Sequence, residues 1–144
     1  MTNKQKYTIV SALVIGVFMG AALTWYIVVG SSNGVENSKP EYSLEAVAFF
    51  NEYNKNKEQA NDKFNGKIIE VSGNIAEMFK NKDSEMTIIL RNNQTFTGIS
   101  CTLENSDKQI KKPLKIGSLI TIKGKCTGKA NDVILTNCYI VKTE

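Results

Sequence analysis

Residues Lys67–Phe79 read KIIEVSGNIAEMF, and every second position from Ile69 to Ile75 is apolar or glycine. This alternation is typical of a β-strand that buries one face. It recurs in four later segments, which are separated by turn-forming clusters rich in Asn, Asp and Gly. These segments are Met86–Leu90, Thr97–Leu103, Ser118–Cys126 and Val133–Val141. Five short strands without a helical repeat between them predict a mainly β domain, either a small barrel or a sandwich.

Two features of these strands favour a barrel. Gly73 lies in the first strand and Gly124 in the fourth, and glycine permits the sharp bends that close a five-stranded barrel. The fifth strand loses its alternation near Asn137. A β-bulge at this position is therefore expected.

The segment Ser43–Phe64 precedes the strands and has apolar residues at spacings of three and four. This spacing predicts an amphipathic helix, with Ser43 as its N-cap. The Asn-rich sequence at Asn54–Asn56 predicts a break into two helices. We interpret the apolar face as part of the core rather than as a groove for a partner.

The composition excludes several kinds of site. The 144 residues include 18 Lys and Arg, 14 Asp and Glu, three Cys and no His. The lack of His excludes Ser-His and Cys-His nucleophilic pairs and histidine-ligated haem. Three Cys without a CxxC spacing cannot complete a four-cysteine zinc site. We expect no metal, no haem and no other cofactor.

The first thirty residues determine the expected compartment. Residues Thr8–Val29 read TIVSALVIGVFMGAALTWYIVV and carry no charge. A helix of this length spans roughly 33 Å, enough for a hydrocarbon core of about 30 Å. Lys4 and Lys6 precede the segment, so the positive-inside rule predicts a cytoplasmic N-terminus and an extracytoplasmic C-terminal domain.

A cleaved signal peptide ending near Val28–Gly30 is the alternative, although this apolar segment is longer than a typical signal sequence. Either alternative exports the domain. We expect a cytoplasmic stub and transmembrane helix at 1–30, a flexible tether at 31–41 and the exported domain at 42–144.

Three runs carry a family resemblance. Glu58–Gly73, Leu114–Gly128 and Asp132–Cys138 resemble the tRNA_anti-like family of exported OB-fold proteins. The resemblance covers roughly residues 43–142. It implies a five-stranded OB barrel preceded by a helix, either attached to a membrane or secreted. It implies no activity and transfers no catalytic residue, because fold alone does not determine function.

The strand order of an OB barrel bears on the cysteines. It places the fifth strand beside both the third and the fourth, so Cys138 is the cysteine expected to have a partner, either Cys126 or Cys101. An oxidising compartment allows this disulfide. The alternative is that all three cysteines are small buried hydrophobic residues.

OB folds bind oligonucleotides and oligosaccharides on the face of strands two and three, with the loops that join strands one to two and four to five. The candidate binding residues in this region are Lys80, Lys82, Arg91, Phe96, Lys129 and Asn131. Phe79 and Phe96 both lie at strand ends, which makes a poor stacking platform for bases. Nucleic-acid binding is therefore not favoured.

Four lysines lie ahead of the fourth strand, namely Lys108, Lys111, Lys112 and Lys115. They could contact anionic lipid, cell-wall polymer or nucleic-acid phosphate. We interpret them instead as a solvated surface of a lysine-rich protein.

The predicted function is binding without catalysis. The carboxylates of Glu70, Glu77, Asp83 and Glu85 show no motif for paired acid–base chemistry. We expect a membrane-anchored, extracytoplasmic interaction module with a protein partner in the cell envelope. The alternative is binding of nucleic acid or another polyanion, such as an oligosaccharide, through the face of strands two and three.

Overall fold

The computed structural model describes residues 34–91 and 97–144. The chain divides into two units, residues 1–34 and residues 35–144, and every element described below belongs to the second unit. The expected membrane span Thr8–Val29 lies outside the described residues. Within the described residues, no helix has both the length and the apolar character needed to cross a membrane.

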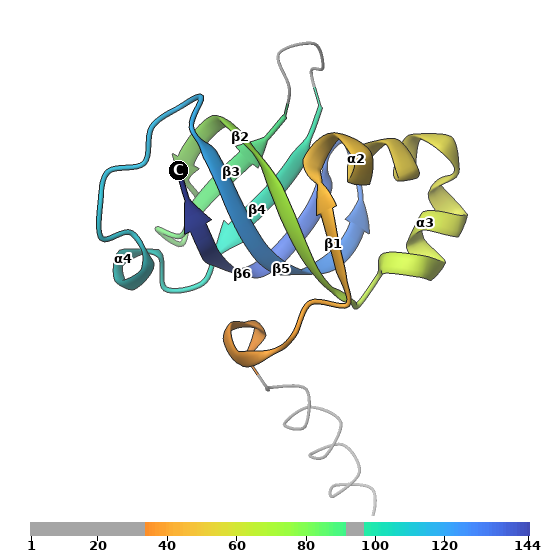
Figure 1. The fold of residues 1–144 in the computed structure, drawn as a ribbon, viewed down its shortest axis with the longest axis horizontal. Helices are drawn as coiled ribbons and strands as arrows, with labels where there is room; N and C mark the ends of the chain where they lie inside the picture. The colour runs from red at the N-terminus through yellow and green to blue at the C-terminus, as the bar shows by residue number, and fades with distance from the viewer. Residues whose placement is uncertain (1–33, 92–96) are drawn as a thin grey trace, which may run out of the picture. The chain divides into compact units, whose positions relative to one another are not determined.

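Five strands form a closed barrel (Figure 1). They are β2 (Ile68–Lys80), β3 (Met86–Leu90), β4 (Ile99–Leu103), β5 (Leu119–Lys129) and β6 (Val133–Thr143). Their order is β2-β3-β4-β6-β5, and pairing of β2 with β5 closes the sheet. The β4–β6 pairing is parallel and the other barrel pairings are antiparallel. This connectivity is that of an OB barrel, and the prediction of a mainly β, five-stranded barrel is confirmed.

The long strand β2 closes the barrel because it pairs with two different strands. Its first half pairs with β5 between Ile68 and Asn74, and its second half pairs with β3 from Ile75 onward. A register shift just after Ile75 marks the change of partner. Ile69, Val71 and Ile75 are all at most 1% exposed, so the alternation seen in the sequence is the inward face of this strand.

The two strand glycines stand where side chains approach the backbone closely. A Cβ at Gly73 would lie 2.8 Å from the Cβ of Ala46. A Cβ at Gly124 would overlap the Sγ of Cys138 and lie 3.0 Å from the Cβ of Leu135. The pairing of β5 with β6 also shifts register at Gly124. Glycine is therefore needed here for close packing as well as for the bend.

The bulge predicted in the last strand is confirmed. Asn137 has a φ of 51°, in the left-handed region that Asn tolerates better than most residues. The parallel pairing of β4 with β6 shifts register at this point, from Cys101↔Leu135 to Leu103↔Cys138.

The start of the predicted helix is wrong. Residues Tyr42–Glu45 form a sixth strand, β1, which pairs in parallel with the first half of β2. Ser43 caps no helix and its hydroxyl instead donates to the carboxylate of Glu70 at 3.2 Å. A four-residue strand is too short to be distinguished from a helical turn by its periodicity alone.

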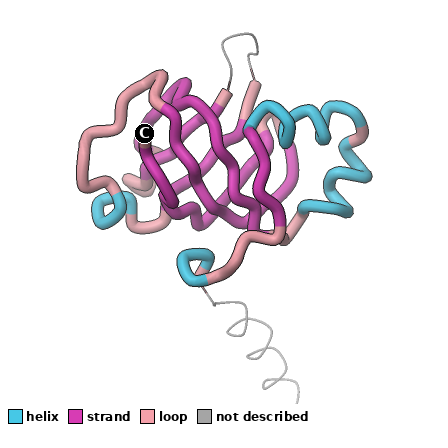
Figure 2. The backbone as a smooth tube through the Cα atoms, viewed as in Figure 1, coloured by secondary structure: helices cyan, strands magenta, loops and turns pink. Residues whose placement is uncertain are grey.

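Two helices follow, α2 (Ala46–Lys55) and α3 (Lys57–Phe64), as the predicted break requires. Asn56 separates them, and its side chain accepts a hydrogen bond from the backbone N–H of Gln59 at 3.0 Å. Figures 1 and 2 show both helices at one end of the barrel. Phe49 and Phe64 pack edge to face there, with ring centroids 5.1 Å apart. The apolar face of the helices is thus core, as interpreted.

Two short helices lie elsewhere. The 3₁₀ helix η1 (Val35–Asn37) buries Val35, and Lys123 of β5 donates to the carbonyls of Glu36 and Ser38 at 3.0 and 2.8 Å. The compact unit therefore begins at Val35, within the tether expected at 31–41. Helix α4 (Ser106–Gln109) connects β4 to the long segment before β5.

All three cysteines lie within the described residues and are buried. The side chain of Cys138 hydrogen-bonds to Cys101, and the thiol of Cys126 lies 3.2 Å from the hydroxyl of Tyr53. Burial, together with the contact to Cys101, raises the pKa of the Cys138 thiol. Of the two partners expected for Cys138, Cys101 is thus the one in side-chain contact, and the disulfide itself stays a prediction.

We expect cysteine thiols of the folded protein to react with iodoacetamide at pH 8 at least about a hundredfold more slowly than those of the unfolded protein. They are fully buried, and the raised pKa keeps Cys138 protonated at this pH. Mass spectrometry of quenched samples measures the rate. Fast labelling of the folded protein would contradict the buried placement. Unfolding without reductant then decides the disulfide, since three labels mean free thiols and one label means a bridge.

Candidate functional site

The outer face of β3 and β4, where OB folds bind ligands, is small and largely covered. Thr87 and Ile89 of β3 point away from the core cluster, yet they are only 5% and 6% exposed. The Thr87 hydroxyl lies 3.3 Å from that of Thr102 on β4. Phe79, at the end of β2, is 49% exposed and is the aromatic side chain available on this face among the described residues.

Two of the predicted binding residues lie near the turn that joins β2 to β3. Lys80 ends β2 opposite Met86, and its ammonium group lies 3.9 Å from the carboxylate of Asp107 in α4. Lys82 is exposed in the loop between β2 and β3. An exposed ion pair at this distance is weak, so both lysines are accessible to an anion.

The other predicted residues lie elsewhere or make internal contacts. Arg91, after β3, forms an ion pair with Glu77. Lys129 hydrogen-bonds to Asn54 of α2, and its ammonium group lies 4.4 Å from the ring centroid of Phe50. Asn131 is exposed in the β5–β6 turn. Phe96 lies outside the described residues. The five of these residues that the structure describes therefore do not converge on one site, and the role of the six as a binding site stays a prediction.

The carboxylates also do not converge. Glu77 pairs with Arg91, Glu70 accepts from Ser43, and Glu85 accepts from Asn81 at 3.0 Å. Among the described residues, no three Cys, Asp or Glu side chains come close enough together to hold a metal ion.

A different surface has the shape of a site. Two adjoining open cavities of about 480 and 560 Å³ lie between the segment from α4 to β5 and the end of β6. Both are lined by Gln109, Lys111 and Ile140. We call this surface the α4–β5 cleft. Its lysines are Lys108, Lys111, Lys112, Lys115 and Lys123, and its carboxylates are Glu36 and Glu144.

The cleft is held by backbone and amide contacts. The side chain of Gln109 donates to the carbonyl of Cys138 at 3.0 Å and accepts from the N–H of Ile140 at 2.7 Å. The N–H of Gly117 donates to the carbonyl of Ile75 at 2.7 Å, and Gly117 has a φ of 87°, which favours glycine. The lysines therefore project from an ordered frame.

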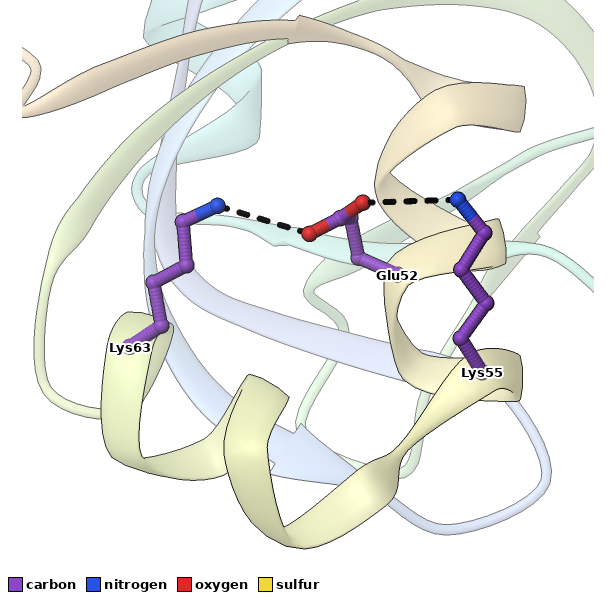
Figure 3. Close-up of polar contacts among 3 residues, drawn as sticks. All are labelled: Glu52, Lys55 and Lys63. Atoms are coloured by element: carbon purple, nitrogen blue, oxygen red, sulfur yellow. Dashed lines mark hydrogen bonds and ion pairs between the residues drawn. The ribbon is translucent and has the colours of Figure 1, made fainter.

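The cleft lysines differ from Lys55 and Lys63 at the helical end. There, the carboxylate of Glu52 lies 3.4 Å from the ammonium group of Lys63 and 3.9 Å from that of Lys55 (Figure 3). By contrast, the exposed lysines 108, 111, 112 and 115 form no ion pair within residues 34–91 and 97–144. Their positive charge is left for an external anion.

The acidic side of the cleft lies around Tyr139. Partial burial, and then the nearby carboxylates of Glu104 and Glu36, raise the pKa of the Tyr139 phenol. Glu104 also accepts a hydrogen bond from this phenol. Glu36 therefore lies in the cavity that Tyr139 lines, whereas Glu144 lines the other cavity together with Lys112 and Lys115 and is paired to Lys142.

Comparison with known proteins identifies a family and a solved structure with a similar fold. No curated protein sequence matches the chain. A solved structure from Klebsiella pneumoniae subsp. pneumoniae MGH 78578, named as a putative nucleic acid-binding lipoprotein, is similar with a TM-score of 0.57 and 21% identity. The similarity covers 69% of this chain and 91% of that one. The family model tRNA_anti-like matches residues 1–140, so the chain belongs to the tRNA_anti-like family.

Proposed function

We propose that this protein is a binding module of the cell envelope, held at the membrane by Thr8–Val29 with its OB barrel outside the cytoplasm. The observation that carries the proposal is this uncharged segment of 22 residues behind Lys4 and Lys6. The name of the Klebsiella protein, a lipoprotein, supports an envelope location.

Binding without catalysis is the second part of the proposal. OB barrels present a rigid face and loops to a ligand. In the described residues the carboxylates of Glu70, Glu77 and Glu85 are each engaged by a different partner. Acid–base chemistry of the glycosidase kind needs two carboxyl groups that face each other in a cleft, and no such pair lines the α4–β5 cleft.

Cysteine labelling in intact cells tests the topology. We expect a membrane-impermeant maleimide to label Val47→Cys, which is 41% exposed on α2, without permeabilisation. Thr2→Cys, in the expected cytoplasmic stub, should be labelled only after permeabilisation. The unmodified protein is the control, because its own thiols are buried. Labelling of Val47→Cys only after permeabilisation would refute the exported topology.

Nucleic-acid binding on the outer face of β3 and β4 is the second candidate. It is favoured by the OB fold and by the name of the Klebsiella protein. Against it, Arg91 and Lys129 are already engaged within the protein, and Phe79 offers one stacking surface where single-stranded ligands normally use several.

Titration of residues 31–144 with single-stranded DNA over a range of salt concentrations separates the candidates. If bases stack on Phe79, the Phe79→Ala variant should bind single-stranded DNA at least about tenfold more weakly than the unmodified fragment. The affinity of the unmodified fragment for DNA should then also fall steeply as the salt concentration rises. We expect Phe79→Ala to leave any binding unchanged, with Lys55→Gln as a control distant from the face. A tenfold loss in Phe79→Ala alone would favour the nucleic-acid candidate.

A further inference from the structure

We propose that the α4–β5 cleft docks on the surface of a bilayer that contains anionic phospholipid, with its lysines binding the headgroup phosphates. The proposal rests on the envelope anchor proposed above and adds the surface that the exported domain contacts. It concerns a different surface from the outer face of β3 and β4, which OB folds use for oligonucleotides.

The first argument is charge. The cleft is lined by five lysines against two glutamates. Four of the lysines are exposed and form no ion pair with the described residues. The fifth, Lys123, donates hydrogen bonds to the backbone carbonyls of Glu36 in η1 and of Ser38 just after it. Each basic side chain near an anionic membrane surface contributes to attraction, and several together produce stable docking.

The second argument is an exposed apolar side chain among these lysines. Ile116 follows Lys115 directly and is 68% exposed, more than any other large hydrophobic residue in 34–91 and 97–144. Val141, which lines one of the two cavities of the cleft, is 50% exposed. Basic residues next to exposed apolar ones are typical of segments that lie in the membrane interface, where the apolar group is buried and the charges meet phosphates.

The third argument is chain connectivity. Helix η1 is the first described element after the expected span, and its Glu36 lines the cleft together with Lys108 and Lys111. Only six peptide steps join Val29 to Val35, which is at most about 22 Å of extended chain. The short sequence between Val29 and Val35 therefore limits how far the exported domain could lie from an anchor that ends at Val29.

Lipid fits the cleft better than nucleic acid does. Tyr139 is the single aromatic side chain that lines it among the described residues, and its hydroxyl is bound to Glu104. Base stacking needs several accessible rings. An array of phosphates with apolar chains beneath matches both the lysines and Ile116.

The test uses the full chain with Ile116→Cys carrying an environment-sensitive fluorophore, reconstituted in nanodiscs. One set contains phosphatidylcholine alone and the other contains phosphatidylcholine with phosphatidylglycerol. We expect a blue shift of the emission only with phosphatidylglycerol, and its loss at high salt. A label on Val47→Cys, at the helical end, should show no shift.

Two charge-matched variants make the test specific. Replacement of Lys111, Lys112 and Lys115 by Gln should abolish the blue shift. The same replacement of Lys55, Lys57 and Lys63 should preserve it, since these lysines belong to α2 and α3, which Figure 1 shows at the opposite end of the barrel from α4. Equal loss in both variants would overturn the proposal, because bulk charge would then explain the effect.

Other outcomes also overturn it. Emission that is the same in both kinds of nanodisc would contradict docking while leaving the anchor intact. A shift caused by single-stranded DNA in phosphatidylcholine nanodiscs, without a response to phosphatidylglycerol, would assign the cleft to nucleic acid. A chain that elutes apart from both kinds of nanodisc would instead contradict the anchor, and with it the docking that depends on the anchor.

Discussion

The architecture depends on how closely β5 can approach its two neighbours. In β5, Gly124 pairs with Ile69 of β2 on one side, and the Sγ of Cys138 from β6 lies against it on the inner side. This contact leaves no room for a Cβ. Because β2 also pairs with β3, the β2–β5 contact turns an open sheet into a barrel with an inside and an outside. The position of the α4–β5 cleft depends on this closure, because the cleft lies between the segment that precedes β5 and the end of β6.

Closure also explains which parts of the fold could be predicted from the sequence. Alternating residues such as Val71 and Leu135 must face inward once the barrel closes, so the period of two identified all five strands. Asn137 broke that period and indeed marks a bulge. Strand β1 was missed because Tyr42–Glu45 takes its conformation from its pairing with β2, a long-range contact with no local signal.

The candidate site was less predictable. The six predicted binding residues were selected by analogy with other OB barrels, and analogy does not reveal internal partners such as Glu77 for Arg91 or Phe50 for Lys129. The sequence shows the positive charge of the segment Lys108–Lys115 directly, and on sequence grounds alone this segment is interpreted as solvated surface. The shape of the cleft cannot be predicted from the sequence. It requires hydrogen bonds from Gln109 to Cys138 and Ile140 of β6, which lie 29 and 31 positions further along the chain.

The free energy of unfolding of residues 31–144 with Gly124→Ala tests the closure most directly, since this fragment contains the compact unit 35–144 and its whole core. Gly34→Ala, where a Cβ meets open space, is the matched control. We predict a loss of about 1–3 kcal/mol for Gly124→Ala by urea denaturation, none for the control, and partial recovery when Cys138→Ala is added. Unchanged stability of Gly124→Ala would contradict the account.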